Sequence, residues 1–231
     1  MLTFYCRGFQ LREMYYMKSL IENKTLKSSI SVILILFFSI FFQDVQSAEI
    51  LSDKEILDIK NEAFALYSTD NKEEALELIN RIPQNRRDED VFVVLGNIYD
   101  DMGKRGTAIE NYNKASLVSS KAYKAYYNIG CILLKKKSYA LAKKNFNLSI
   151  KSNREFPYSY YNLASCYIAE ENYSKAKKYL IKAIALKADE KDFYINLAYC
   201  YKMLGNEKAA AKIVDSLNAL KTSTLFQKSF S

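Results

Sequence analysis

The sequence predicts an all-α chain, folded as an α-solenoid of about five helical hairpins. The 231 residues include only 6 glycines and 2 prolines, and a chain this poor in turn-forming residues favours helices. Small residues recur every 34 positions, at Gly96, Gly130, Ala164 and Ala198. The apolar residues around each of these positions follow the three- and four-residue spacing of a helix face. A repeat of this length is typical of solenoids.

An apolar run, ISVILILFFSIFF at residues 30–42, precedes the repeats. The flanking charges are Lys18, Lys24 and Lys27 before the run and Asp44, Glu49 and Asp53 after it. This distribution predicts that the N-terminus stays inside and that the rest of the chain lies outside the cytoplasm. The run is shorter than the roughly 20 residues of a comfortable membrane span, and it matches the apolar core of a signal peptide. We therefore interpret residues 1–47 as a leader cleaved before Ala48.

Two alternatives stay open for this leader. A start at Met17 would give a signal peptide of more ordinary length than a start at Met1. If the leader is not cleaved, residues 30–42 would anchor the chain to a membrane. Both interpretations place the repeats outside the cytoplasm: the protein is periplasmic or extracellular, or it is membrane-anchored with its repeats on the outer side.

Each 34-residue unit has the pattern of two helices joined by a short polar turn. In the first helix an aromatic residue stands four positions before each small residue: Phe92, Tyr126, Tyr160 and Tyr194. In the second helix an alanine stands twelve positions after each small residue: Ala108, Ala142, Ala176 and Ala210. Gly103 and Gly205, in two of the turns, suit a left-handed position at a helix end. The pattern predicts hairpins at about 89–122, 123–156, 157–190 and 191–221.

A weaker unit at about 56–88 precedes these four. Ala63 and Ala75 are again twelve residues apart, and Pro83 is expected to end the second helix. Terminal repeats are commonly atypical, because one of their faces caps the stack. The repeats are therefore predicted to form a single solenoid over residues 52–220, followed by a flexible tail at 222–231.

The segment FVVLGNIYDDMGKRGTAIENYNKA, from Phe92 to Ala115, resembles the tetratricopeptide repeat. That family's signature is an aromatic residue, then Leu-Gly, Tyr, Ala, another aromatic residue and Ala. The resemblance implies a right-handed superhelix whose first helices line a concave face that binds protein. The proline that often closes each unit of the family is absent from all of these units.

On the face that the resemblance assigns to binding, asparagine stands two residues before the small residue in four of the five units. Val94 takes that place in the unit at 89–122, with Asn97 one turn further on. An amide both donates and accepts hydrogen bonds, as a peptide group does, so such a row suits an extended peptide. The alternative is that these asparagines belong only to the family's sequence pattern. The candidate groove residues are Asn61, Phe64, Asn97, Tyr127, Asn128, Tyr161, Asn162, Asn196 and Tyr199. Lys60 and Lys124 come from non-adjacent units, which argues against a clamp for a C-terminal carboxylate.

The sequence offers no catalytic, metal or cofactor site. Histidine is absent, which removes the commonest metal ligand and general base. Neither a glycine-rich phosphate loop nor a Cys-x-x-Cys pair occurs. Beyond the leader the odd count of cysteines, Cys131, Cys166 and Cys200, favours free thiols packed as small side chains. We expect a protein that is not an enzyme and needs no cofactor.

Charge changes sign along the chain. Residues 48–120 carry 9 basic and 15 acidic side chains, and residues 121–231 carry 20 basic and 8 acidic ones. Most of the lysines fall on second helices or turns, where they are expected to solvate the outer surface, so nucleic acid is not the expected partner. The predicted function is that of an exported scaffold whose groove binds a protein or peptide segment. The alternative is a self-associating structural or envelope-assembly protein, a homo-oligomer that uses the end of its solenoid as an interface.

Overall fold

The computed structural model describes residues 51–228, and within them the chain forms ten α-helices, one 3-10 turn and no strand. The predicted all-α solenoid is confirmed. The predicted leader, its apolar run at 30–42, the cleavage point and residues 229–231 lie outside the described residues. Of the helices in the described part, none is both long and apolar enough to cross a membrane.

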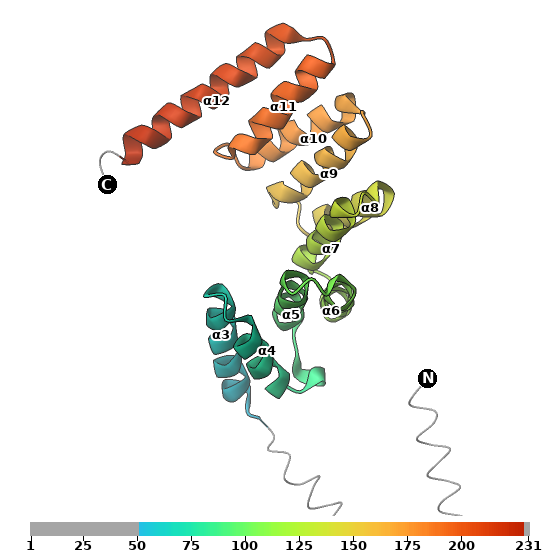
Figure 1. Cartoon of the computed structure of the whole chain (residues 1–231), viewed down its shortest axis with the longest axis vertical. Coiled ribbons are helices and arrows are strands. Elements are labelled where there is room, and N and C mark those ends of the chain that lie inside the picture. Colours follow the sequence, from blue (N-terminus) through green and yellow to red (C-terminus); the bar gives the residue numbers. More distant parts are fainter. Residues whose placement is uncertain (1–50, 229–231) are drawn as a thin grey trace, which may run out of the picture. The chain divides into compact units, whose positions relative to one another are not determined.

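The ten helices follow one another as five hairpins (Figure 1). In order, the hairpins are α3 (Asp53–Ser68) with α4 (Lys72–Arg81), α5 (Glu89–Asp101) with α6 (Arg105–Val118), α7 (Tyr123–Lys135) with α8 (Tyr139–Ser152), α9 (Pro157–Ala169) with α10 (Tyr173–Leu186), and α11 (Lys191–Met203) with α12 (Glu207–Lys228). The 3-10 turn, Gln84–Arg86, follows the first hairpin. From α4 onward, each second helix also contacts the first helix of the next hairpin.

The first hairpin ends where the sequence predicts, whereas the last helix continues past its predicted end. At the first hairpin, α4 ends at Arg81 and Ile82 is extended, just before Pro83, as the proline predicts. At the other end, α12 continues to Lys228, past the boundary predicted at residues 220–222. Residues 207–228 contain neither glycine nor proline, so no backbone signal ends the helix at the predicted place.

The two helices of a hairpin meet at the small residue of the first helix. A Cβ atom added at Gly130 would lie 2.6 Å from Cε1 of Phe146, and one added at Gly96 would overlap the ring of Tyr112. In the fourth hairpin the small residue is Ala164, and the residue opposite it is the smaller Leu180. Glycine thus stands opposite a ring and alanine opposite an aliphatic side chain, which keeps the volume of the crossing nearly constant.

Neighbouring hairpins share an apolar core that changes composition along the chain. Phe193 of α11 packs against Ala183 of α10 and Tyr160 of α9. One hairpin earlier, serine occupies both equivalent positions. There the hydroxyls of Ser149 and Ser159 lie 2.7 Å apart, and Ser149 also donates to the Tyr123 carbonyl at 2.8 Å. These buried hydroxyls satisfy one another, so the serines fit the core.

Every hairpin turn contains one residue in the left-handed region: Asp70, Gly103, Lys137, Glu171 and Gly205. In each turn the next residue's N–H bonds back five positions, as in Ser138 to the Leu133 carbonyl at 2.9 Å. This is the Schellman pattern of helix ends, which favours glycine because other residues pay a steric cost there. Lys137 and Glu171, with φ of 59° and 58°, therefore carry strain that glycine would relieve.

Replacing Lys137 with glycine is expected to stabilise the chain by about 0.5–1 kcal/mol, since the steric relief exceeds the added chain entropy of glycine. Urea denaturation followed by circular dichroism measures the change. The converse variant Gly103→Ala, at a φ of 76°, should destabilise by a similar amount. Equal stabilities of Lys137→Gly and the parent chain would show that the turn tolerates lysine without strain.

Candidate functional site

The predicted row of asparagines joins consecutive first helices. Asn128 of α7 donates through Nδ2 to Oδ1 of Asn97 on α5, at 2.8 Å. Asn162 of α9 donates to the hydroxyl of Tyr127 on α7, at 3.1 Å, and lies 3.3 Å from Sγ of Cys131. Each amide therefore reaches one hairpin back along the chain. These asparagine side chains are only half-buried. The bonds described use only part of the four hydrogen bonds that a side-chain amide can make.

The tyrosines beside the row pack against neighbouring rings. Burial raises the pKa of Tyr161, and a hydrogen bond from Asn196 opposes that shift. The ring centroids of Tyr161 and Phe193 lie 4.9 Å apart, and those of Tyr127 and Phe156 lie 5.1 Å apart. Tyr127 and Tyr161 are thus half-buried supports of the row. Tyr199, on α11, is 44% exposed, so more of its ring is available to a ligand.

A pocket of about 180 Å³ opens at the N-terminal part of this row. It brings together side chains from the first three hairpins. The lining residues are Tyr67, Asn97, Asp100, Asp101, Tyr112, Asn128, Cys131 and Lys135. Asn97 is bonded to two other lining residues, because its Oδ1 accepts from both Asn128 Nδ2 and the Tyr112 hydroxyl, each at 2.8 Å. The pocket therefore offers amide, carboxylate, phenol and ammonium groups side by side.

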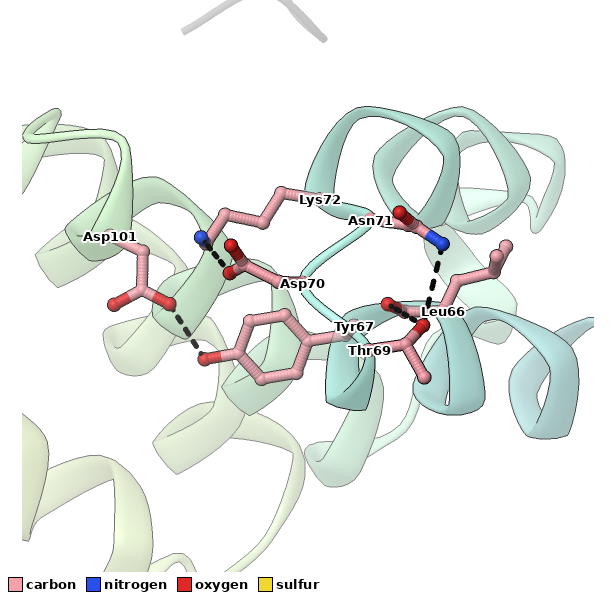
Figure 2. Close-up of polar contacts among 7 residues, drawn as sticks. All are labelled: Leu66, Tyr67, Thr69, Asp70, Asn71, Lys72 and Asp101. Carbon is pink, nitrogen blue, oxygen red and sulfur yellow. Dashed lines mark hydrogen bonds and ion pairs between the residues drawn. The ribbon is translucent and has the colours of Figure 1, made fainter.

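One wall of this pocket is shown in Figure 2, where Tyr67 at the end of α3 points toward Asp101 at the end of α5. The Tyr67 hydroxyl donates to Oδ2 of Asp101 at 2.9 Å. The adjacent turn is held by an ion pair between Lys72 and Asp70. Burial and the Asp101 carboxylate together raise the pKa of Tyr67 to about 12. The hydrogen bond thus joins the first hairpin to the second.

We expect the free energy of unfolding to fall as the pH rises from about 10 to about 12, and to fall less steeply in Tyr67→Phe. The folded pKa of Tyr67 lies above its unfolded value of about 10, so the unfolded chain loses this proton first. Urea denaturation at a series of pH values measures the slope. Identical slopes for the two proteins would show that the Tyr67–Asp101 bond does not contribute to folding.

The two remaining predicted residues lie on α3. Asn61 is exposed and Phe64 is half-buried. Asn61 has no preceding hairpin in the described part of the chain to which it could reach back. Lys60 forms an ion pair with Asp88, the residue that caps α5 by accepting from the Val91 N–H. That pairing joins Lys60 to the start of the second hairpin.

Of the eight lining residues only Asn97 and Asn128 were predicted as groove residues, and six were not: Tyr67, Asp100, Asp101, Tyr112, Cys131 and Lys135. Spacing could have found four of these, because Asp100 and Asp101 follow Asn97 by one helical turn, and Cys131 and Lys135 follow Asn128 by one and two turns. Tyr67 could not be found in this way, since it comes from another hairpin. In the part of the chain that the structure describes, no three His, Cys, Asp or Glu side chains are grouped as metal ligands.

Models of the tetratricopeptide repeat match three segments of the sequence, at residues 89–121, 123–156 and 167–224. The chain contains tetratricopeptide repeats. The first two matches coincide closely with the hairpins α5–α6 and α7–α8, and the third begins within α9 and ends within α12. The glycine–aromatic crossings and left-handed turns described above are thus features of tetratricopeptide hairpins in this chain.

Solved structures of MamA proteins share the fold. One, of residues 41 to the end of MamA from Desulfovibrio magneticus RS-1, is 22% identical with a TM-score of 0.63, covering 74% of this chain and 97% of that one. Another MamA crystal structure is 20% identical with a TM-score of 0.62, covering 71% and 96%. At these identities the likeness concerns the fold alone. The curated proteins contain no match to the sequence.

Proposed function

We propose that this tetratricopeptide protein is a non-enzymatic scaffold, exported from the cytoplasm, which captures an extended protein segment on the face lined by its first helices. The observation that carries the proposal is the pocket around Asn97 and Asn128. Amide, carboxylate and phenol groups from three successive hairpins converge there. These groups can both donate to and accept from a peptide backbone, whereas a solvated helix surface needs no such convergence.

The half-buried amides are also pre-organised for this task. Asn128 and Asn162 are each fixed by a bond to the preceding hairpin, so a ligand would not have to immobilise them. Binding that needs little ordering of side chains retains more of its contact energy. Further along, Ile195 and Tyr199 on α11 are 51% and 44% exposed and would supply apolar contact. The face thus combines fixed polar groups with accessible apolar ones.

Export is supported by the apolar run at 30–42 and the charges that flank it. N-terminal sequencing of the chain recovered from cells tests cleavage: a terminus at Ala48 supports a signal peptide. An intact leader in the membrane fraction supports an anchor.

The function is tested with the double variant Asn128→Ala, Asn162→Ala. We expect capture of a cross-linked cellular partner by the full chain to fall about tenfold or more, since two fixed hydrogen-bonding groups are lost. The matched control is Asn113→Ala, Asn147→Ala, which removes two exposed amides from equivalent places on the second helices α6 and α8. Both proteins should keep their far-UV helical signal. Undiminished capture by the groove variant would contradict the proposal.

A second candidate function is self-association through the last hairpin. In the last hairpin, Ile195 and Met203 of α11, Leu204 of the turn and Val214 of α12 are 43–51% exposed. The residues equivalent to Val214 in the preceding hairpins, Leu180, Phe146 and Tyr112, are fully or almost fully buried. Light scattering of the purified chain tests this function. A concentration-dependent rise in mass that Val214→Ser abolishes would support it, and a monomer at high concentration would exclude it.

A further inference from the structure

A second pocket, of about 470 Å³, lies outside the candidate groove. Three lysines and three tyrosines line it: Tyr160 and Tyr167 from α9, and Lys175, Lys178, Tyr179 and Lys182 from α10. Every charged side chain in this lining is positive. None of the lining residues belongs to the asparagine row, so this pocket is a separate surface of the molecule.

The three lysines of the pocket lie on a helix that carries no carboxylate. The helix α10 carries Lys175, Lys177, Lys178 and Lys182 and no acidic residue. In the described part of the chain no ion pair joins Lys175, Lys178 or Lys182 to a carboxylate, and all three are exposed. Like charges three and four positions apart destabilise a helix, and a positive charge in the first turn opposes the helix dipole. An anion bound here would relieve both effects.

Two of the tyrosine rings that line this pocket pack against each other and against lysines. The rings of Tyr167 and Tyr179 are stacked with an interplanar angle of 2° and centroids 5.5 Å apart. The ammonium groups of Lys143 and Lys175 lie over the Tyr167 ring, at 4.9 and 5.4 Å from its centroid. Lys143 is in turn fixed by Glu170, whose Oε1 accepts from its Nζ at 2.7 Å.

The geometry points to an extended acidic peptide as the ligand of this pocket. Lys178 and Lys182 are four residues apart on α10, a rise of about 6 Å along the helix. Alternate side chains of an extended peptide are spaced by about 6.6 Å, so acidic residues at every second position would match these lysines. A nucleic-acid strand is disfavoured because its bases would need ring faces to stack on, and those of Tyr167 are already covered.

This acidic-peptide site, defined by Lys175, Lys178 and Lys182, is independent of the asparagine row. It is tested by isothermal titration of the purified full chain with the peptide acetyl-Glu-Ser-Glu-Ser-Glu-amide. The variant Lys178→Gln, Lys182→Gln should bind about fivefold or more weakly, given the usual strength of exposed charge pairs. The control Lys208→Gln, Lys212→Gln removes the same charge from exposed positions of α12 and should stay within about twofold of the parent chain.

Two further measurements distinguish this site from the asparagine row and from a general anion site. The groove variant Asn128→Ala, Asn162→Ala should bind the acidic peptide as the parent chain does. Inorganic phosphate and a short oligothymidylate should bind more weakly than the peptide. Equal weakening by both lysine variants would mean that only overall charge matters and would overturn the site. Tighter binding of phosphate or oligothymidylate than of the peptide would overturn its assignment to acidic peptide.

Discussion

Replacing Phe193 with alanine is expected to destabilise the last hairpin by about 3–5 kcal/mol, the usual loss for a buried aromatic ring. Phe193 is 1% exposed, and the centroid of its ring lies 4.9 Å from that of Tyr161 and 5.9 Å from that of Tyr158. It therefore fills the junction between the hairpins α9–α10 and α11–α12. In a repeat protein, stability is approximately a sum over hairpins and their nearest-neighbour interfaces. The damage should consequently stay local.

Amide hydrogen exchange followed by mass spectrometry measures this effect. We expect protection in α11 and α12 to fall sharply while α5 to α8 keep theirs. The matched control is Ile195→Ala on the same helix, since Ile195 is 51% exposed and its truncation should cost about 0.5 kcal/mol or less. An equal loss of protection in all hairpins would show that the solenoid unfolds as one unit, contrary to the local interface described above.

Replacing Gly130 with alanine is expected to destabilise the chain by about 1–3 kcal/mol, although alanine is the better helix former. The added methyl group would lie 2.6 Å from Cε1 of Phe146. The Phe146 ring is fully buried, so it cannot move into solvent to avoid the contact. Gly106, also in a helix, would meet nothing within 4 Å, so Gly106→Ala should instead stabilise by about 0.5 kcal/mol. Urea denaturation measures both changes.

The second substitution Phe146→Leu should recover part of the loss in Gly130→Ala. The double variant recreates the alanine–leucine crossing that the chain already has at Ala164 and Leu180. Because the two residues are in contact, their effects should be strongly non-additive. If Gly130→Ala alone left stability unchanged, or if Phe146→Leu made it worse, the volume of the crossing would not explain the choice of glycine.

The hairpins could be predicted from the sequence because each crossing imposes a local rule. A small residue must face a large one, and this requirement recurs every 34 residues. The positions of Gly96 and Gly130 opposite Tyr112 and Phe146 follow from it directly. The end of α12 could not be predicted in the same way. No glycine or proline marks it, and a helix without such a signal can continue beyond the packing pattern.

The contacts of the candidate site were harder to predict, because they join residues from different hairpins. The position of Asn128 on a face follows from its spacing, but its bond to Asn97 depends on how two hairpins stack. The bond between Tyr67 and Asp101 spans 34 residues and likewise requires the three-dimensional arrangement. The charge pattern could be predicted only in part. The sequence shows an excess of lysine, but it does not show that three of these lysines line a pocket with Tyr167 and Tyr179.

The central claim is that the face lined by the first helices captures another protein, and site-specific photo-cross-linking tests it most directly. A benzoylphenylalanine placed at Tyr199 in the full chain, in living cells, should give a defined protein adduct. The same group placed at Leu117, which is 84% exposed on the second helix α6, is the control and should give only background. Adducts at Leu117 with none at Tyr199 would contradict the claim.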